Sequence, residues 1–226
     1  MDSALIIFDG ANFSRLLGGL GVSLRIAVLA VVISLFGGVL FGMLMNSKNV
    51  FIRACCRVIL ETVRIVPQLV WLFVFYFEMT KAFHIHLDAK VASIIVFSLW
   101  GIAEMGDLVR GAITSLPLHQ WQSGRAIGLT KTQLYRYIIL PQAVRRLLPP
   151  AINLVTRMIK TTSLVVLIGV IEVLKVGQQV IEVSIFSAPS AAFWVYGFIF
   201  FLYFIVCWPV SLAAKKLEQY WARRGV

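Results

Sequence analysis

The sequence predicts an all-helical integral membrane protein. Of its 226 residues, 60% are apolar and only 14% are charged, against roughly 45–50% and about 25% in soluble globular domains. The mean hydropathy is +0.89, and a water-soluble domain of this size could not bury so much apolar surface. The apolar residues form long runs separated by basic segments, which is typical of a multi-pass helical topology.

Five apolar stretches are long enough to cross a hydrocarbon core of roughly 30 Å, which takes about 20 helical residues. They cover about residues 22–45, 58–77, 91–109, 150–171 and 192–214. Charged residues lie inside or at the edges of these stretches, so the helices must face protein or water on at least one side. We expect the stretches to form a single transmembrane domain over residues 1–226.

The basic residues predict the orientation of the chain. Thirteen Lys and Arg residues lie in the segments 46–57 and 110–148 and in the C-terminal tail, whereas the alternate segments hold four, Arg15, Lys81, Lys90 and Lys175. Basic segments stay in the cytoplasm. The prediction is therefore a multi-pass protein of the cell (inner or plasma) membrane, with its N-terminus outside and its C-terminus in the cytoplasm.

Segment 111–148 is too long for a simple connector and contains signals for helices. Residues 118–127 are compatible with a helix that stops at Gly128, because glycine readily adopts the left-handed conformation that follows many helices. Thr130 and Gln133 have the spacing of a capping box that begins a second helix, and Pro141 marks the end or a bend of that helix. The segment is predicted to form a helix–glycine–helix elbow on the cytoplasmic side.

This elbow resembles the EAA signature of the permease subunits of ABC importers. Gln122-Ser123-Gly124, three residues, Gly128, nine residues and then Ile138-Ile139-Leu140-Pro141 have the spacing EAA-x3-G-x9-I-x-L-P. The flanking residues and the segments 64–69, 104–113 and 160–164 are similar to the polar amino acid uptake subfamily. The chain departs from the signature at the triplet itself, where a neutral glutamine supplies no carboxylate for an ion pair.

The resemblance implies a type I ABC importer permease that forms the translocation pathway for polar amino acids and catalyses no reaction itself. Two ATPase subunits that bind ATP-Mg would dock on the elbow. The residues implied in this contact are Gln122, Ser123, Gly124, Ala126, Gly128, Leu129, Ile138, Leu140 and Pro141. A second copy or a related permease, an extracytoplasmic amino-acid-binding protein and membrane lipid are the other expected partners; nucleic acid, a metal and a resident cofactor are not expected. The amino acid carried stays open.

Polar residues in and near the fourth stretch predict a hydrophilic pathway through the membrane. The candidate residues are Glu104, Asn153, Thr156, Arg157, Lys160, Thr161, Thr162 and Ser163. Residues 153, 156 or 157, 160 and 164 share a helical stripe, which suits a water-filled path for a zwitterionic solute. The alternative is a set of structural pairs in which Arg157 or Lys160 bonds Glu104 or Asp107.

Two other functions stay open on the sequence alone. A secondary transporter or channel needs no ATPase, and a membrane-embedded lipid-modifying enzyme needs His, Asp or Glu clustered near an interface. The sequence shows no internal repeat, which disfavours an inverted-repeat transporter, and its acidic residues are scattered. It also has no GxxxxGK[ST] loop, so an ATP-driven protein of this sequence must take its ATPase from another chain.

Overall fold

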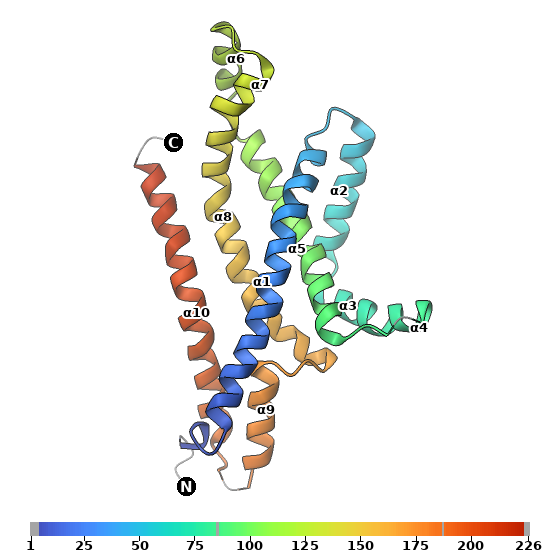
Figure 1. Cartoon of the computed structure of the whole chain (residues 1–226), viewed down its shortest axis with the longest axis vertical. Coiled ribbons are helices and arrows are strands. Elements are labelled where there is room, and N and C mark those ends of the chain that lie inside the picture. The colour runs from blue at the N-terminus through green and yellow to red at the C-terminus, as the bar shows by residue number, and fades with distance from the viewer. Residues whose placement is uncertain (1–4, 85, 187, 224–226) are drawn as a thin grey trace. The chain divides into compact units, whose positions relative to one another are not determined.

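The computed structural model describes residues 5–84, 86–186 and 188–223, and their regular secondary structure is helical, as predicted (Figure 1). The four long helices are α1 (Asn12–Met45), α5 (Ala89–Thr114), α8 (Leu140–Thr161) and α10 (Ala191–Ala222). The chain divides into two compact units, each built from three separate segments. Unit 1 comprises residues 1–31, 66–98 and 156–209, and unit 2 comprises residues 32–65, 99–155 and 210–226.

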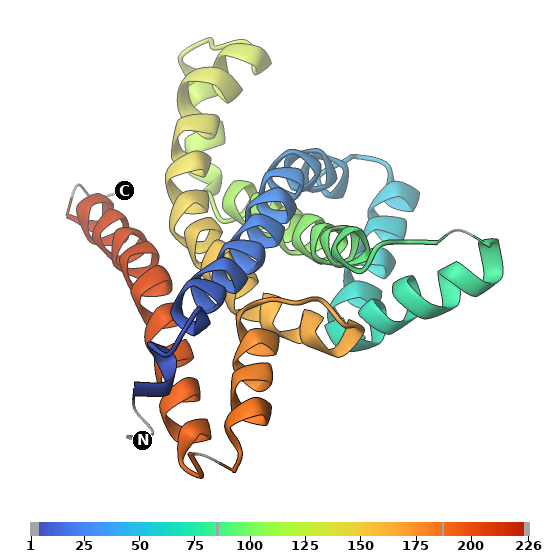
Figure 2. The same cartoon turned by 60° about the horizontal axis from the view of Figure 1, so that its bottom comes forward.

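Unit 1 is built around the short helix α9 (Val173–Ser184). Figure 2 shows α9 beside the first turns of α10, and the apolar face of α9 packs there and against the beginning of α1. The buried residues of this core include Leu16, Leu20, Val173, Val176, Val180, Val195 and Ile199. The unit also contains η1 (Leu5–Ile7), α3 (Gln68–Phe73), the π-helical η2 (Val74–Glu78), α4 (Met79–Phe83) and the 3-10 segment η4 (Thr162–Ile168).

Unit 2 contains α2 (Val50–Ile65), the elbow and the adjoining parts of the long helices. Here α1 and α5 approach closely because glycines face larger side chains. A Cβ atom at Gly38 would overlap Met105, and one at Gly42 would lie 2.6 Å from the Cβ of Val109. Small residues at such a contact allow two helix backbones to pack directly, so this glycine pair serves packing within the chain.

Among the residues that the structure describes, four helical segments are long and apolar enough to cross a membrane, namely Asn12–Met45, Ala89–Thr114, Lys131–Ile168 and Ala191–Trp221. The helices Val50–Ile65 and Gln68–Glu78 meet the same criteria only together, and they are bent by 96°. The bend falls at Pro67, which lacks the N–H that would continue α2. The predicted stretch 58–77 is therefore a broken span or a re-entrant loop, and the total of four or five spans agrees with the prediction.

Helix boundaries differ from the predicted ones at several points. α1 begins ten residues before the first apolar stretch, and α9 lies between the fourth and fifth apolar stretches, where no helix was predicted. Of the two alternatives predicted for Pro141, an end or a bend of the second elbow helix, the structure excludes the end. A π-helical turn, η3 (Tyr135–Ile139), leads directly into α8, which continues through Pro149 and Pro150. Packing of an amphipathic helix outweighs such local preferences.

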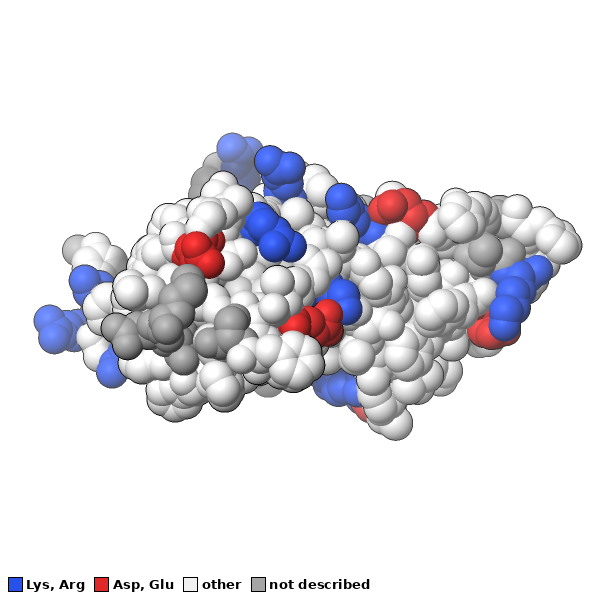
Figure 3. Space-filling view, turned by 90° about the horizontal axis from the view of Figure 1, so that it is seen from below, with Lys and Arg blue, Asp and Glu red and all other residues white. Residues whose placement is uncertain are grey.

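In the view of Figure 3, uncharged residues cover most of the surface and charged side chains stand in small groups.

Candidate functional site

The elbow consists of α6 (Leu118–Ala126), a glycine turn and α7 (Lys131–Leu134), which continues through η3 into α8. Gly128 has a φ angle of +81°, as predicted for the residue after the helix. Its N–H donates to the carbonyl of Arg125 at 3.0 Å, and the N–H of Leu129 donates to the carbonyl of Gly124 at 3.1 Å. These two bonds form a Schellman motif, which fixes the direction in which the chain leaves α6.

The second helix of the elbow begins with the predicted capping box. The backbone N–H of Thr130 donates to Oε1 of Gln133 at 2.9 Å, and the N–H of Gln133 donates to Oγ1 of Thr130 at 3.4 Å. Both ends of the glycine turn are therefore satisfied by hydrogen bonds of the chain itself. The elbow that the sequence predicts is present, with the predicted residues at its two caps.

A small apolar core holds the two arms of the elbow together. Gly124 is buried against Leu134 so closely that a Cβ atom would overlap the leucine side chain. The rings of Trp121 and Tyr135 meet edge to face with 5.2 Å between their centroids. A larger residue in place of Gly124 would therefore require the Leu134 side chain to shift.

Two further contacts tie α8 to α6 of the elbow and to the segment between α5 and α6. The side-chain amide of Gln142 on α8 donates to Oε1 of Gln120 on α6 at 3.2 Å. The guanidinium of Arg146, one turn further along α8, donates to the carbonyl of Ser115 at 2.7 Å and to its hydroxyl at 3.1 Å. Figure 1 shows α6 and α7 folded against each other at the end of α8. The elbow and this part of α8 thus form one packed body.

The nine residues that the signature implies for an ATPase contact divide into two groups in the structure. Gly124 is buried, and Leu129 and Ile138 are half-buried in the elbow core. The exposed ones are Gln122, Ser123, Ala126, Gly128, Leu140 and Pro141. Leu118, Ile127 and Tyr137 are large apolar residues that are also exposed on the elbow, and an exposed apolar patch is typical of a protein interface. The contact with an ATPase stays a prediction.

The predicted pathway residues of the fourth stretch also separate. Asn153, Arg157 and Lys160 are exposed, and their spacing places them on one face of α8. Thr156 is buried, so it does not share that face. The hydroxyls of the next three residues donate to backbone carbonyls one turn earlier: Thr161 to Arg157, Thr162 to Ile159 and Ser163 to Lys160, at 2.7–3.0 Å. Three of the residues therefore present a continuous polar face, and its role in transport stays a prediction.

Glu104 belongs to an ion-pair network within unit 2. Arg64, at the end of α2, donates from Nε to Oε1 of Glu104 at 2.9 Å and from Nη2 to Oδ2 of Asp107 at 3.0 Å. Arg110 donates to the other oxygen of Asp107 from Nη2 at 2.6 Å and from Nε at 3.0 Å. Both carboxylates of α5 are thus engaged by Arg64, a partner that the sequence reasoning did not assign to them.

Sequence reasoning missed Glu172, a fully buried carboxylate at the start of α9. Its Oε1 accepts the backbone N–H of Lys175 at 2.9 Å, and its Oε2 accepts the hydroxyl of Ser23 on α1 at 3.1 Å. Burial raises the pKa of Glu172, and these hydrogen bonds oppose that rise. The available signal was its place just before the spaced apolar residues Val173, Val176 and Val180, where an N-cap is expected.

The fold and the elbow define a class: a multi-pass helical membrane protein that presents a rigid two-helix projection at the end of one long helix. Residues 38–224 match the family of binding-protein-dependent transport system inner membrane components, and the chain belongs to that family. It is an integral component of a transport system of the inner membrane.

Two relatives agree with this assignment, and a solved structure has the same fold. The chain is 30% identical over 212 residues to the probable glutamine ABC transporter permease protein GlnP of Bacillus subtilis, covering 93% of this chain and 95% of that protein. It is 30% identical over 193 residues to the glutamine transport system permease protein GlnP of Escherichia coli, covering 83% and 86%. A crystal structure of an amino acid ABC transporter with histidines has the same fold, with a TM-score of 0.83, 24% identity and coverage of 92% and 94%.

Proposed function

We propose that the chain is the permease subunit of an ATP-driven ABC importer of polar amino acids and that a separate ATPase docks on its elbow. The observation that carries the proposal is the elbow itself. Its turn has the glycine, the capping box and the spacing of the importer signature, its inner face is packed around Gly124, and its outer face is exposed. The relatives named for glutamine transport support an amino acid as the substrate.

Coupling follows from the way the elbow is joined to α8. When the ATPase subunits bind ATP and close, they displace the exposed face of the elbow. The Gln142–Gln120 bond joins α6 of the elbow to α8, and the Arg146–Ser115 bond joins α8 to the residue that follows α5, so the displacement reaches both long helices. Because α8 is continuous from Leu140 to Thr161, it carries the movement to the face that bears Arg157. Hydrolysis itself belongs to the ATPase, and this chain contributes no catalytic group.

The polar face of α8 supports the pathway. Asn153, Arg157 and Lys160 offer an amide and two cationic groups within a segment that is apolar enough to span a membrane. Ionisable side chains are costly in that setting and mark solute pathways or paired groups. A guanidinium recognises a carboxylate with two parallel hydrogen bonds, and every amino acid carries an α-carboxylate. A second permease copy or a related permease would complete the pathway, and an extracytoplasmic binding protein would deliver the substrate.

The test is reconstituted transport. The chain should co-purify with its ATPase. Proteoliposomes that contain both proteins should take up radiolabelled glutamine only when two conditions are met: ATP is present on the side of the membrane that the elbow faces, and a binding protein is present on the opposite side. A hydrolysis-deficient ATPase variant serves as the control and should abolish uptake. Uptake at the full rate by the chain without an ATPase would favour a secondary transporter or channel and overturn the proposal.

A further inference from the structure

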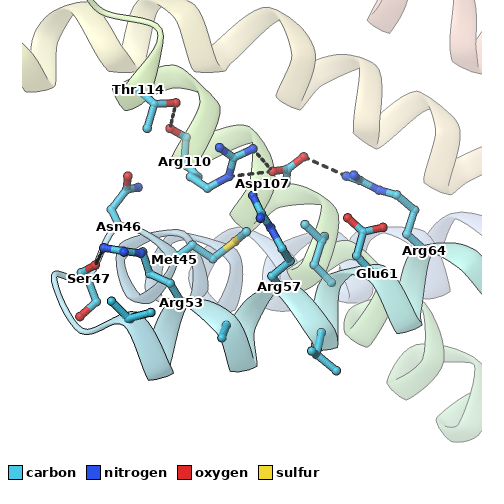
Figure 4. A pocket seen from close by; sticks show the side chains of 14 residues that line it. Met45, Asn46, Ser47, Arg53, Arg57, Glu61, Arg64, Asp107, Arg110 and Thr114 are labelled. Carbon is cyan, nitrogen blue, oxygen red and sulfur yellow. Dashed lines mark hydrogen bonds and ion pairs between the residues drawn. The ribbon is translucent and has the colours of Figure 1, made fainter. Parts of the chain in front are cut away.

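Unit 2 contains a cavity of about 710 Å³ that neither the elbow nor the polar face of α8 uses. It is lined by the end of α1, by one face of α2 and by the end of α5 that is predicted to face the cytoplasm. Among the lining side chains are four arginines, Arg53, Arg57, Arg64 and Arg110, and two acids, Glu61 and Asp107. Figure 4 shows these groups around one common space. The side chains that line the cavity therefore carry an excess of positive charge.

The arginines are not equally neutralised. Asp107 already accepts hydrogen bonds on both of its oxygens, from Arg64 and Arg110. Arg53 donates to the backbone carbonyl of Ser47 at 3.0 Å, which leaves its charge uncompensated. Arg57 makes no hydrogen bond or ion pair within the described part of the chain, and Figure 4 shows it directed from α2 toward the cavity. The cavity thus offers two guanidinium groups to an anion.

The surface beside the cavity is strongly apolar. Beside the face of α2 that carries its arginines lies an apolar face. On it, the side chains of Phe51, Val58 and Ile65 are exposed by 74%, 66% and 74%. Their spacing places them on one side of the helix. A small soluble anion makes no contact with an apolar surface of this kind. A phospholipid, by contrast, places its phosphate at a polar site and its acyl chains along the neighbouring apolar surface. Basic pockets between membrane helices on the cytoplasmic side bind anionic headgroups in this way.

We propose that the arginine cavity holds the phosphate of an anionic membrane phospholipid, with Arg57 and Arg53 as its ligands and the Phe51–Val58–Ile65 flank along its acyl chains. The planar guanidinium forms two parallel hydrogen bonds with phosphate oxygens, which a compact ammonium does not. Glu61 lines the same cavity and forms no ion pair within the described residues. It repels the phosphate, so it sets an upper limit on the affinity.

The experiment measures the lipid that stays bound to the full chain. The chain is reconstituted in nanodiscs of phosphatidylcholine and phosphatidylglycerol at equal amounts, extracted in mild detergent and examined by native mass spectrometry. The wild type should retain phosphatidylglycerol in clear excess over phosphatidylcholine. Arg57→Gln should reduce the retained phosphatidylglycerol roughly tenfold, the size expected for the loss of a charge-assisted hydrogen bond. Arg57→Lys should restore only part of it, and Glu61→Gln should increase it.

Lys48→Gln is the matched control, because Lys48 is an exposed cation in the adjoining loop and does not line the cavity. It should retain as much phosphatidylglycerol as the wild type. Equal retention of the two lipids by the wild type, or equal losses in Arg57→Gln and Lys48→Gln, would overturn the proposal. If millimolar inorganic phosphate displaces the lipid or stabilises the wild type in pure phosphatidylcholine, the occupant is a soluble phosphate and the lipid assignment is wrong. The assay needs neither ATPase nor amino acid, so its outcome is independent of the transport proposal.

Discussion

Gly124 on α6 and Leu134 at the end of α7 are packed so tightly that even one methyl group on the glycine would overlap the leucine. The contact joins the two arms of the elbow, and an alanine in place of Gly124 would require the Leu134 side chain to shift. It also separates two roles within the triplet: Gln122 and Ser123 are exposed, whereas Gly124 is part of the elbow core.

Gly124→Ala should loosen the elbow, because overpacking of a close contact costs about 1–3 kcal/mol. Hydrogen exchange of residues 118–140 should become faster, and binding of the ATPase should weaken. Ser123→Ala is the control on the same helix at an exposed position, and it should change stability by less than about 0.5 kcal/mol. The double variant Gly124→Ala with Leu134→Val should exchange more slowly than Gly124→Ala alone. Exchange in Gly124→Ala that matches the wild type would contradict the packing argument.

Gly128→Ala should uncouple the elbow without preventing membrane insertion. The φ angle of +81° at this position costs an L-residue with a Cβ atom roughly 1–2 kcal/mol. We expect a lower rate of uptake and weaker stimulation of ATP hydrolysis by loaded binding protein, at an unchanged amount of chain in the membrane. Gly111→Ala makes the same chemical change at a helical position with open space around it, and transport should stay normal there. Full stimulation in Gly128→Ala would remove the turn from the coupling mechanism.

Arg157→Ala should reduce transport about tenfold or more if this guanidinium contacts the substrate carboxylate, since a hydrogen bond to a charged group contributes about 1.5–3 kcal/mol. Arg157→Lys should recover only part of the loss, because lysine keeps the charge and loses the planar fork. Uptake in proteoliposomes is the measurement, with the amount of assembled complex determined in parallel. Arg145→Ala, an exposed arginine earlier on α8, is the control. A full rescue of transport in the double variant Arg157→Ala with Glu104→Gln would assign Arg157 to structural pairing.

Glu172 should make the stability of the chain depend on pH in a defined direction. Burial raises the pKa of this carboxyl above its ordinary value of 4.5, so the folded state binds its proton more tightly than the unfolded state does. The free energy of unfolding is therefore greatest below pH 4.5 for this group and falls as the pH rises through the raised pKa. Glu172→Gln keeps one oxygen that can accept the N–H of Lys175, and its amide N–H can donate to the hydroxyl of Ser23. Because glutamine cannot ionise, this part of the pH dependence should disappear.

Thermal unfolding in detergent between pH 4 and 8 measures the effect of Glu172→Gln. Glu182→Gln is the control, because Glu182 lies on the same helix and is not fully buried; its pH profile should follow that of the wild type. A wild-type profile that rises over the interval in which Glu172→Gln is flat would contradict the sign argued above.

The class of the protein and the local form of its elbow follow from the amino-acid sequence alone. Composition requires a bilayer, the long apolar runs require helices, and the glycine turn and capping box at Gly128 and Thr130 depend only on residues within a few positions of each other. Such features can be predicted from a sequence because their physical causes are local. For the same reason the local capping signals at Gly128, Thr130 and Gln133 predicted both caps correctly.

The contacts between residues that are far apart in the sequence became known from the tertiary structure. Arg64 engages Glu104 and Asp107 across some forty positions of sequence, and Ser23 reaches Glu172 across 149. Neither pairing follows from periodicity, because an ion pair or a buried hydrogen bond is selected by the packing of whole helices. Likewise, Thr156 is turned inward while Asn153 and Arg157 face outward, which depends on the rotation of α8 against its neighbours. The arginine cavity exists for the same reason: its cations come from two helices that packing alone brings together.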